Sequence, residues 1–576
     1  MDQKMFLAVA LSMLVMIGFY AAFPPAPPEP KRASQDGAET APTAEPGQPP
    51  VQGQAAPALP AVPSAAVAAA AQRVRVETPR YIAEIDTRGG MLASLKLKDY
   101  VVAKAHLDWG DLIPPLRQIS FLHSILAKPG AGADAPVEMV RGDFPGSGTL
   151  GLRFPDDLPL TGEIDQTVFS ADRGEIVLTS QSAPETLVLT GRTPRGLTVR
   201  KSITFDPVSY VLHYGASVIN YGDSAVPVRI QHLFGEGSRP TAETARAYGH
   251  VGPIFRSDGS VETEDAEDMT PQFLVRDVGW LGIGEPYFLT AAAPDSTISH
   301  GFYEAIPNPD PKGHPAWIAR YGMELPAVTL EPNKQVESAF RLYAGPKQED
   351  DLAKFGDALP EALDITLEAL AKPLLAMLRW FNGYTGNYGI AIILLTIVVR
   401  VALFPLTYKG MVSMKRMQKL QPRMVAVREK FKNDREKMNR EMMAMYKRYK
   451  VNPLGGCLPI LLQLPIFFAL YSALGSAIEL RHTEFFGWLT DLSAMDGLFI
   501  MPLLMGASMV IQQRLTPTTA DPMQAKILAW MPVIFTLFMF TFPSGLTLYW
   551  FTSNLLSMAQ QVVINRVKVP EPVEQG

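Results

Sequence analysis

The feature that most constrains this chain is an apolar run at residues 388–406, YGIAIILLTIVVRVALFPL, which contains one arginine, Arg400. The run is long enough to cross a bilayer, because about 20 apolar residues in a helix span the hydrocarbon core. A guanidinium stays charged, and placing one at mid-membrane costs about 2.5–3.5 kcal/mol on insertion scales. We therefore interpret Arg400 as a functional residue. The alternative is that its side chain reaches the headgroups from near one end of the helix.

Composition agrees with a membrane protein. The chain has 576 residues, slightly positive mean hydropathy and several long apolar runs, which predicts an integral membrane protein with more than one domain. Its single cysteine, Cys457, excludes an intrachain disulfide and a cysteine metal site.

The N-terminal region divides into an apolar segment, 1–23, and a Pro/Ala-rich segment, 24–72. We expect the first to be a retained transmembrane helix rather than a cleaved signal peptide, because no good small-x-small cleavage site precedes Pro24. The second lacks large apolar side chains and is predicted to be a disordered tether.

Residues 73–346 consist of short segments in which apolar residues recur with period two, bounded by Gly, Pro, Asn and Asp. This pattern predicts a large antiparallel β domain. Seven of the eight histidines lie here without an HxH or HxxxH pair, so we expect no metal site.

A helical pattern follows at residues 358–382, with leucines on one side and charged residues on the other. Because this segment ends in Arg379-Trp380-Phe381 just before an apolar run, it suits an amphipathic helix lying in the membrane interface. A helix that caps the β domain is the alternative.

The most basic part of the chain is 408–451, with fourteen Lys or Arg against four Asp or Glu between residues 409 and 450. By the positive-inside rule this segment is cytoplasmic. Two apolar repeats with helical spacing, joined at residues 432–435, predict a helical hairpin. Methionines fill much of its seam, which suits contact with apolar clients; the alternative is that they form the hairpin core. The residues are Met417, Met424, Met438, Met442 and Met445.

The chain is thus predicted to be an α-helical polytopic membrane protein with an all-β domain outside the membrane. Both termini are predicted to be cytoplasmic, with residues 565–576 as a short tail. Two spans have only about sixteen residues, roughly 24 Å against a core near 30 Å, which suggests a locally thinned bilayer. Besides the first segment, the predicted spans are 386–407, 454–478, 497–513, 526–542 and 545–564.

The residues inside these spans exclude several chemistries. Arg400 is the only charge in their interior, whereas ion-coupled transport usually needs a titratable group at membrane depth. No intramembrane protease set and no phosphate-binding loop is present. Uncharged polar residues accompany the arginine, including Thr396 on the same helix face and Gln463 on another span. Such groups suit either a wet cavity around Arg400 or ordinary hydrogen bonding between helices.

Several segments resemble the YidC/Oxa/Alb family of membrane protein insertases, in the form that carries a large periplasmic domain. The order of elements also matches, including TRGG at 87–90 near the start of the β domain. The matching C-terminal segments are TIVVRVALFPLT at 396–407, LQPRM at 420–424, VNPLGGCLPILLQLPIFFALY at 451–471, DPMQAKI at 521–527 and MPVIFTLFMFTFPSGLTLYW at 531–550.

The resemblance implies a non-enzymatic insertase and chaperone of the bacterial inner membrane, acting without a cofactor. It implies a periplasmic β-supersandwich, and five helices around a hydrophilic groove open to the cytosol and lipid. The partners would be nascent membrane proteins, the Sec translocon for larger clients and the lipid bilayer. We expect no direct nucleic-acid binding and a monomeric chain. The positions that match groove or client-contacting residues are Arg400, Thr396, Gln463, Tyr549 and Trp550.

Two features depart from the family pattern. Trp550 stands where close relatives have tyrosine, so this position keeps an aromatic ring and loses a hydroxyl. The tail is short and carries Glu571 and Glu574, so we expect at most weak contact with ribosomes, in contrast to family members with long basic tails. Two rival functions stay open from the residues alone. They are a solute transporter or channel with a capture domain outside, and an assembly scaffold that binds through its β domain.

Overall fold

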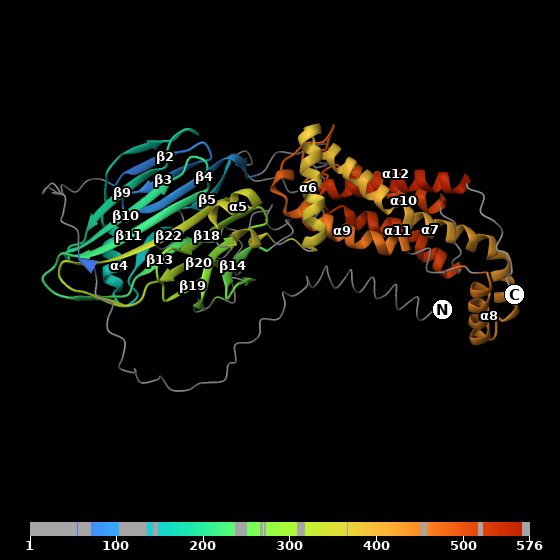
Figure 1. Cartoon of the computed structure of the whole chain (residues 1–576), viewed down its shortest axis with the longest axis horizontal. Coiled ribbons are helices and arrows are strands. Elements are labelled where there is room, and N and C mark those ends of the chain that lie inside the picture. Colours follow the sequence, from blue (N-terminus) through green and yellow to red (C-terminus); the bar gives the residue numbers. More distant parts are fainter. Residues whose placement is uncertain are drawn as a thin grey trace, which may run out of the picture.

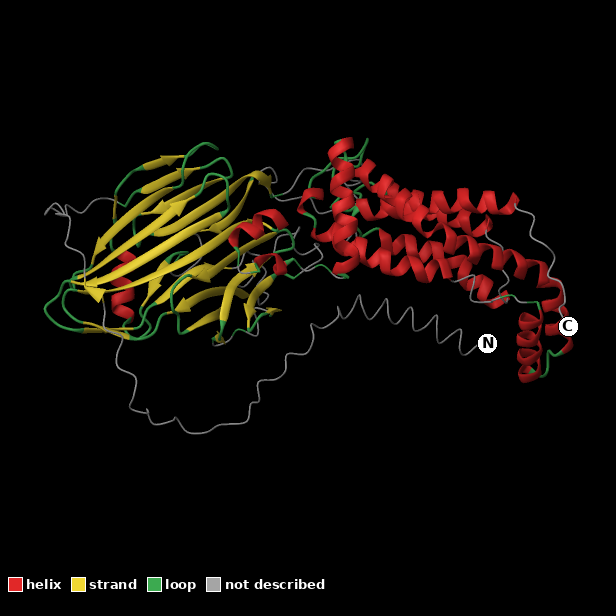
Figure 2. Cartoon of the chain, in the orientation of Figure 1, coloured by secondary structure: helices red, strands yellow, loops and turns green. Residues whose placement is uncertain are grey.

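The computed structural model divides the chain into a β domain and a helical half, joined in the region of residues 347–367 (Figures 1 and 2). The predicted first span, 1–23, lies outside the described residues, as do most of the tether 24–72 and most of the tail 565–576. The described residues are 54–55, 71–102, 135–141, 148–236, 250–264, 269, 272–307, 317–356, 358–363, 365, 367–449, 451, 458–515 and 522–566.

The β domain is built from one ten-stranded sheet, two five-stranded sheets and a two-stranded ladder. All pairs are antiparallel except β2 with β8. The β-rich prediction is therefore confirmed, and its assignment as a β-supersandwich stays a prediction.

The strands of the large sheet lie in the order β15 (Ser260–Thr263), β14 (Gly252–Ser257), β17 (Val278–Gly284), β18 (Phe288–Pro294), β22 (Lys334–Pro346), β11 (Val211–Asn220), β10 (Leu197–Phe205), β9 (Glu185–Arg192) and β7 (Ser170–Ala171), with β1 (Gln54–Ala55) paired to β22. The first small sheet is β16 (Phe273–Val275), β19 (His300–Pro307), β20 (Trp317–Glu324), β13 (Gln231–Glu236) and β6 (Gly151–Arg153). The second is β5 (Pro136–Arg141), β4 (Met91–Val101), β3 (Tyr81–Asp86), β2 (Arg73–Glu77) and β8 (Glu175–Val177). The ladder pairs β12 (Val226–Val228) with β21 (Val328–Leu330), and α4 (Leu158–Gln166) follows β6.

The period-two pattern of the sequence becomes burial on alternate residues. In β3, Tyr81, Ala83 and Ile85 are buried while their neighbours are partly exposed. Successive side chains of a strand point to opposite faces, so each strand contributes one apolar row to the core.

A buried lysine connects three parts of the β domain. The Nζ atom of Lys201 on β10 donates to the carbonyls of Gly89 (2.8 Å), Gly90 (3.0 Å) and Leu150 (2.7 Å). All three acceptor residues have a left-handed backbone, with φ of 71°, 59° and 69°. Burial lowers the pKa of Lys201 to about 7, because a charge is costly away from water. The left-handed turns at these residues direct three backbone carbonyls of two loops into the interior. The ammonium group of Lys201 provides the hydrogen-bond donor that these buried carbonyls need.

A histidine lies in the aromatic core of the same domain. The His232 ring is fully buried beside Phe340, at 4.7 Å between ring centroids, and its Nε2 lies 3.0 Å from Ser338 Oγ. The Ser338 hydroxyl also donates to Ala216 O, which is compatible with a neutral ring that donates from Nε2. Burial, with a smaller contribution from the Lys201 charge, lowers the pKa of His232 to about 3.

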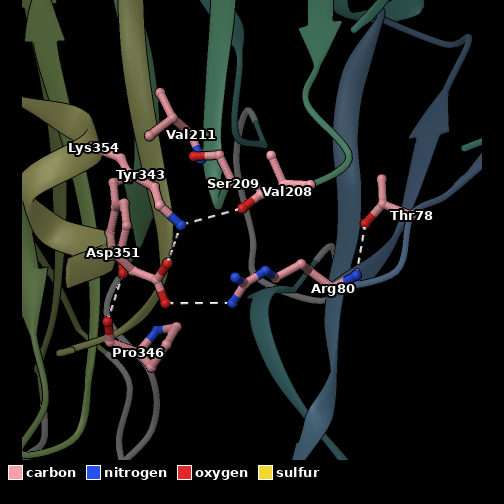
Figure 3. A network of polar contacts seen from close by, with 9 residues as sticks. All are labelled: Thr78, Arg80, Val208, Ser209, Val211, Tyr343, Pro346, Asp351 and Lys354. Carbon is pink, nitrogen blue, oxygen red and sulfur yellow. Dashed lines mark hydrogen bonds and ion pairs between the residues drawn. The ribbon is translucent and has the colours of Figure 1, made fainter. Parts of the chain in front are cut away.

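A polar network around Asp351 connects α5 (Glu349–Phe355) to the loops at one end of the β domain. The Asp351 carboxylate accepts from Arg80 Nη1 at 3.4 Å and from Lys354 Nζ at 2.8 Å (Figure 3). Lys354 also donates to Val208 O at 3.3 Å. Asp351 is buried, so these partners compensate the desolvation of its charge.

The short helix η3 (Leu359–Ala362) follows α5. The helical half contains α6 (Glu368–Thr385), α7 (Tyr388–Lys430), α8 (Arg435–Arg448), α9 (Leu458–Ser476), η5 (Ile478–Leu480), α10 (Ile500–Leu515), α11 (Pro522–Met539) and α12 (Ser544–Arg566). Among the described residues, α7 is the one helix that is long and apolar enough to cross a membrane by itself. Shorter apolar helical stretches occupy Gln463–Gly475 and Ala529–Met539.

The predicted boundary between a span at 386–407 and a hairpin at 408–451 is not a helix end. The helix α7 continues for 43 residues through Pro405 and Pro422, and the chain turns only at residues 431–434. At 1.5 Å per residue α7 is about 65 Å long, roughly twice the hydrocarbon thickness. Its second half therefore forms the first arm of the hairpin.

The segment 358–382 likewise divides between the two parts. In η3, Leu359 and Ala362 pack into the core of the β domain. In α6, Ala371, Leu374 and Leu378 pack with residues of α7 and α9 in the core of the helical half. The β-domain contact of the segment is therefore made by η3, and the placement of α6 in the membrane interface stays a prediction.

We predict that Lys201→Met lowers the free energy of unfolding of the β domain by about 3 kcal/mol, since three inward carbonyls lose their donor. Hydrogen exchange of β9–β11 in urea, measured on the full-length protein in detergent, checks this. Lys98→Met is the control, because Lys98 makes only a surface ion pair with Glu77 and should cost less than about 1 kcal/mol.

We also predict acid sensitivity from His232. Its folded pKa of about 3 is below the unfolded value near 6.5, so the unfolded chain binds the extra proton. The resulting stability is fully present above about pH 6.5 and decreases as the pH falls toward 3. Hydrogen exchange of β13 and β22 at pH 7 and pH 4.5 measures the loss, and His232→Phe should reduce that difference.

Candidate functional site

Arg400 lies on α7 against α12 and is held there by a neutral hydroxyl. Its Nε donates to Ser553 Oγ at 2.9 Å, and its Nη2 contacts the same oxygen. The preceding turns of α7 are fixed by Asn387, whose side chain accepts from Ile390 N at 3.1 Å as an N-cap. Arg400 is partly buried, between the buried Thr396 and the exposed Val401.

Across the described part of the chain, no carboxylate lies within 4.0 Å of the Arg400 guanidinium. A guanidinium has five N–H donors, and Ser553 has a single oxygen to accept them. The arginine is therefore positioned without being neutralised, and it keeps capacity for an anionic or carbonyl partner.

Further polar pairs continue along α12. Asn554 Nδ2 donates to Ser508 Oγ of α10 at 2.9 Å, and Gln560 Nε2 donates to Thr407 Oγ1 of α7 at 2.9 Å. These side chains are buried. We call this set, including Arg400 and Ser553, the polar seam; its members are Arg400, Thr407, Ser508, Ser553, Asn554 and Gln560.

At the end of the seam nearest the hairpin, a lysine binds the last turn of α12. Lys415 Nζ donates to Ile564 O at 3.2 Å and to Asn565 O at 2.9 Å, at the last turn of α12. A cation stabilises the free carbonyls of a helix C-terminus. This contact holds the middle part of α7, near Lys415, against the C-terminal end of α12.

The predicted site residues do not all meet. Gln463 Nε2 on α9 hydrogen-bonds to Tyr549 Oη on α12, which joins two of them. Thr396 is fully buried, and its hydroxyl donates to Ile392 O one turn earlier at 2.6 Å. This hydrogen bond of Thr396 is therefore within its own helix rather than to Arg400.

Trp550 on α12 lies between α9 and α11. Its ring centroid is 4.9 Å from that of Phe467 on α9 and 4.6 Å from that of Phe535 on α11. Both distances suit edge or offset contacts between aromatic rings. Trp550 thus connects two helices that otherwise have few close backbone approaches.

The helix α11 is the most exposed of the bundle over its described side chains. Trp530, Ile534 and Leu537 are 65%, 57% and 60% exposed. One buried contact of α11 is with α10, where Gly506 lies against the Thr536 side chain. The exposed apolar surface fits a lipid-facing helix.

The hairpin methionines are mostly interior. Met417, Met424, Met442 and Met445 pack in one cluster between α7 and α8, together with Leu420 and Tyr449. Met438 is partly exposed. In this structure the four buried residues form the hairpin core, which was the alternative interpretation.

Sequence reasoning named Ser553 and Asn554 only among the scattered polar residues that could surround Arg400, and it did not place Ser508 or Gln560 in the site. A signal was available in α12, where Ser553, Ser557 and Gln560 stand at i, i+4 and i+7. That spacing puts them on one helix face. The partner Ser508 lies on another helix and carries no such signal.

The loop between η5 and α10 is built around two carboxylates, the buried Asp496 and the largely buried Asp491. Asp496 accepts from Met501 N at 2.7 Å and from Trp488 Nε1 at 3.2 Å, which caps the start of α10. Asp491 accepts from Ser493 N at 2.8 Å, and burial raises its pKa. Gly545 N at the start of α12 donates to Leu492 O, so this loop holds two helix ends together.

Together these features define a two-part membrane protein, with a β domain next to a helical bundle that carries a polar seam. Family models match both parts: "YidC periplasmic domain" over residues 133–377 and "60Kd inner membrane protein" over residues 380–571.

Curated relatives cover most of the chain. A membrane protein insertase YidC from Syntrophus aciditrophicus is 37% identical over 503 residues, covering 86% of this chain and 85% of its own. One from Pelobacter propionicus is 38% identical over 512 residues, covering 86% and 87%. A solved structure described as an active YidC insertase with the first transmembrane domain resolved is 18% identical, covers 86% of this chain and 93% of its own, and has a TM-score of 0.35. The chain belongs to the YidC family of membrane protein insertases, which places it in the inner membrane.

We predict that Gly506→Ala destabilises the α10–α11 pair by about 1–3 kcal/mol, because a Cβ there would overlap the Thr536 side chain. Thermal unfolding in detergent measures the effect. Gly475→Ala on α9 is the matched control, since a Cβ there meets no atom within 4 Å and the helix should gain slightly.

Proposed function

We propose that the helical half inserts client segments through a hydrophilic groove along the polar seam, with Arg400 as its fixed positive charge. The observation that carries this proposal is that Arg400 is held by Ser553 and has no carboxylate partner among the described residues. A paired arginine would be electrostatically satisfied; this one attracts acidic residues in the polar flank of a client.

The polar seam supports the same role away from the charge. A client's polar flank must leave water to enter the bilayer, and each unsatisfied polar group costs several kcal/mol in hydrocarbon. Hydroxyl and amide groups such as Ser508, Asn554 and Gln560 exchange their mutual hydrogen bonds for bonds to the client. The gain is a lower barrier, and no covalent step is needed.

We infer that the apolar client segment leaves between α9 and α11. Trp550 closes this side through ring contacts with Phe467 and Phe535, which are weak enough to separate. Since α11 is fastened mainly through α10, its displacement breaks few buried contacts. Gln463 and Tyr549 would then meet the client next to the seam.

The hairpin would recruit clients on the cytoplasmic side through its outer surface. Its four interior methionines support the shape of the hairpin, while Met443 and Val425 are exposed beside many lysines and arginines. We propose that this mixed surface, together with Met438, touches the client first.

The proposed topology has six spans, both termini in the cytoplasm and the β domain in the periplasm. The basic segment at 409–450 supports this orientation. Cooperation with the Sec translocon for large clients, and action alone for small ones, are part of the same proposal. The 16 residues of α10, about 24 Å, support a bilayer thinned around the bundle.

We predict that Arg400→Gln slows insertion of clients with acidic translocated tails about tenfold, the effect of losing roughly 1.4 kcal/mol of charge-assisted contact. Clients whose tails carry Asn and Gln instead should lose less than twofold. Insertion into vesicles containing the purified full-length protein, read by protease protection, measures both.

Arg400→Lys is the matched control, because it keeps the charge and loses the double contact with Ser553. It should retain most of the preference for acidic tails. Equal losses for acidic and neutral tails in Arg400→Gln would contradict electrostatic attraction.

A further inference from the structure

The short helix η5 lies between the cores of the two parts of the protein. Its first residue, Ile478, is buried in the core cluster of the β domain. The preceding residue Ala477 and the last residue Leu480 are buried in the core cluster of the helical half. Figure 1 shows α5, at the end of the β domain, facing α6 of the helical half. One turn of the connection between α9 and α10 is thus shared by both cores.

Arg481, the residue after η5, binds to the β domain through its side chain. Its Nη2 donates to the Val102 carbonyl, directly after β4, at 2.7 Å. The guanidinium carbon lies 5.2 Å from the ring centroid of Phe288 and 5.9 Å from that of Tyr287. Arg481 is 8% exposed, and cation–π contacts are stronger away from water. Apolar burial of Ile478 has no preferred direction, whereas these contacts fix the orientation of η5 against the β domain.

An arginine of α6 connects the same turn to α5. Arg379 Nη2 lies 2.8 Å from Glu479 Oε1 in η5, and Arg379 Nη1 lies 3.7 Å from Glu349 Oε2 in α5. The Glu479 side chain is only 16% exposed, so salt screens its ion pair less than a surface pair. Elements from both parts of the chain therefore meet at η5.

The position of η5 also fixes the end of α9 and the start of α12. The helix α9 ends two residues before η5 begins. His482 N donates to Asp491 Oδ1 at 3.2 Å, and the Ser544 hydroxyl at the start of α12 donates to Asp491 O at 2.6 Å. His482 has a left-handed backbone, with a φ of 61°, so this turn has little freedom to adjust. A displacement of η5 therefore moves the two helix ends together.

We propose that η5 and Arg481 form an interdomain anchor through which the β domain positions α9 and α12 for client insertion. The anchor consists of Ile478, Glu479 and Arg481. Its effect on insertion rests on the proposed function, because α9 borders the proposed client exit and α12 carries Trp550, which closes it. The docking itself rests on the contacts of Ile478 and Arg481 with the β domain. Arg481 is thus a positioning residue, which acts through the two helices.

The docking is tested by a distance between the two parts of the full-length protein. In a Cys457→Ser background, Leu158→Cys in α4 and Leu503→Cys in α10 carry nitroxide spin labels; both native side chains are exposed. Double electron–electron resonance in lipid nanodiscs should give one narrow distance distribution. Arg481→Met removes the donor and the cation, and should broaden the distribution about twofold or more, since domains without a tight interface move relative to each other. An unchanged distribution would overturn the anchor.

Two further variants make this result specific. Arg481→Lys keeps a cation and a donor, and should restore most of the narrow distribution. Arg73→Met is the matched control, because Arg73 forms a surface ion pair with Glu84 and its side chain is 64% exposed; it should leave the distribution unchanged. In Arg481→Met, hydrogen exchange in the first turn of α12 should be about tenfold faster, while β9–β11 should exchange as before because the β domain stays folded.

Insertion into vesicles then tests the positioning role. Arg481→Met should slow clients with acidic tails and clients with neutral tails by the same factor, about threefold or more, because displaced helices affect every client. Unchanged insertion despite a broadened distance distribution would overturn the positioning role. If Arg400→Gln slows both client classes equally while Arg481→Met still broadens the distribution, the electrostatic proposal fails and the anchor holds.

Discussion

The contact between the Arg400 guanidinium and the Ser553 hydroxyl is the interaction on which the helical half depends. It joins α7 to α12 through a partly buried charge at the polar seam of the bundle. A carboxylate there would make a neutral pair and a closed structure, whereas a hydroxyl positions the cation and leaves its charge available. The other members of the polar seam continue this contact between α12 and its neighbours.

The two parts of the chain handle a buried cation in opposite ways. In the β domain, Lys201 meets three carbonyls, which matches the three donors of an ammonium group. Every N–H donor of that ammonium group has an acceptor, and the contact stabilises the β domain. Arg400 meets a single oxygen and keeps unused donors, which suits an exchange of partners.

Much of the architecture was predictable because it depends on local patterns. Period two indicated the β domain, and a long apolar run indicated α7, since burial of one strand face or of a whole helix is visible in the residues themselves. The ends of the helices were harder to predict from the sequence. Pro405 and Pro422 do not interrupt α7, because the surrounding turns continue on both sides of each proline.

Residue roles that depend on facing helices were the least predictable. Thr396 has the right spacing to meet Arg400, yet its hydroxyl bonds to Ile392 O of its own helix. The hairpin methionines have the periodicity of a contact surface, and the same periodicity describes a core. Only packing distinguishes the two.

The sequence by itself determined that the chain has a β domain, a bilayer-length apolar run with one charged residue inside it, and a basic segment beside that run. These follow from composition and spacing along the chain. The tertiary structure decided that Arg400 meets Ser553, that Trp550 bridges Phe467 and Phe535, and that Gln560 meets Thr407. Each of these contacts joins residues far apart in sequence, and helical periodicity states which face a residue occupies without stating which helix it will face.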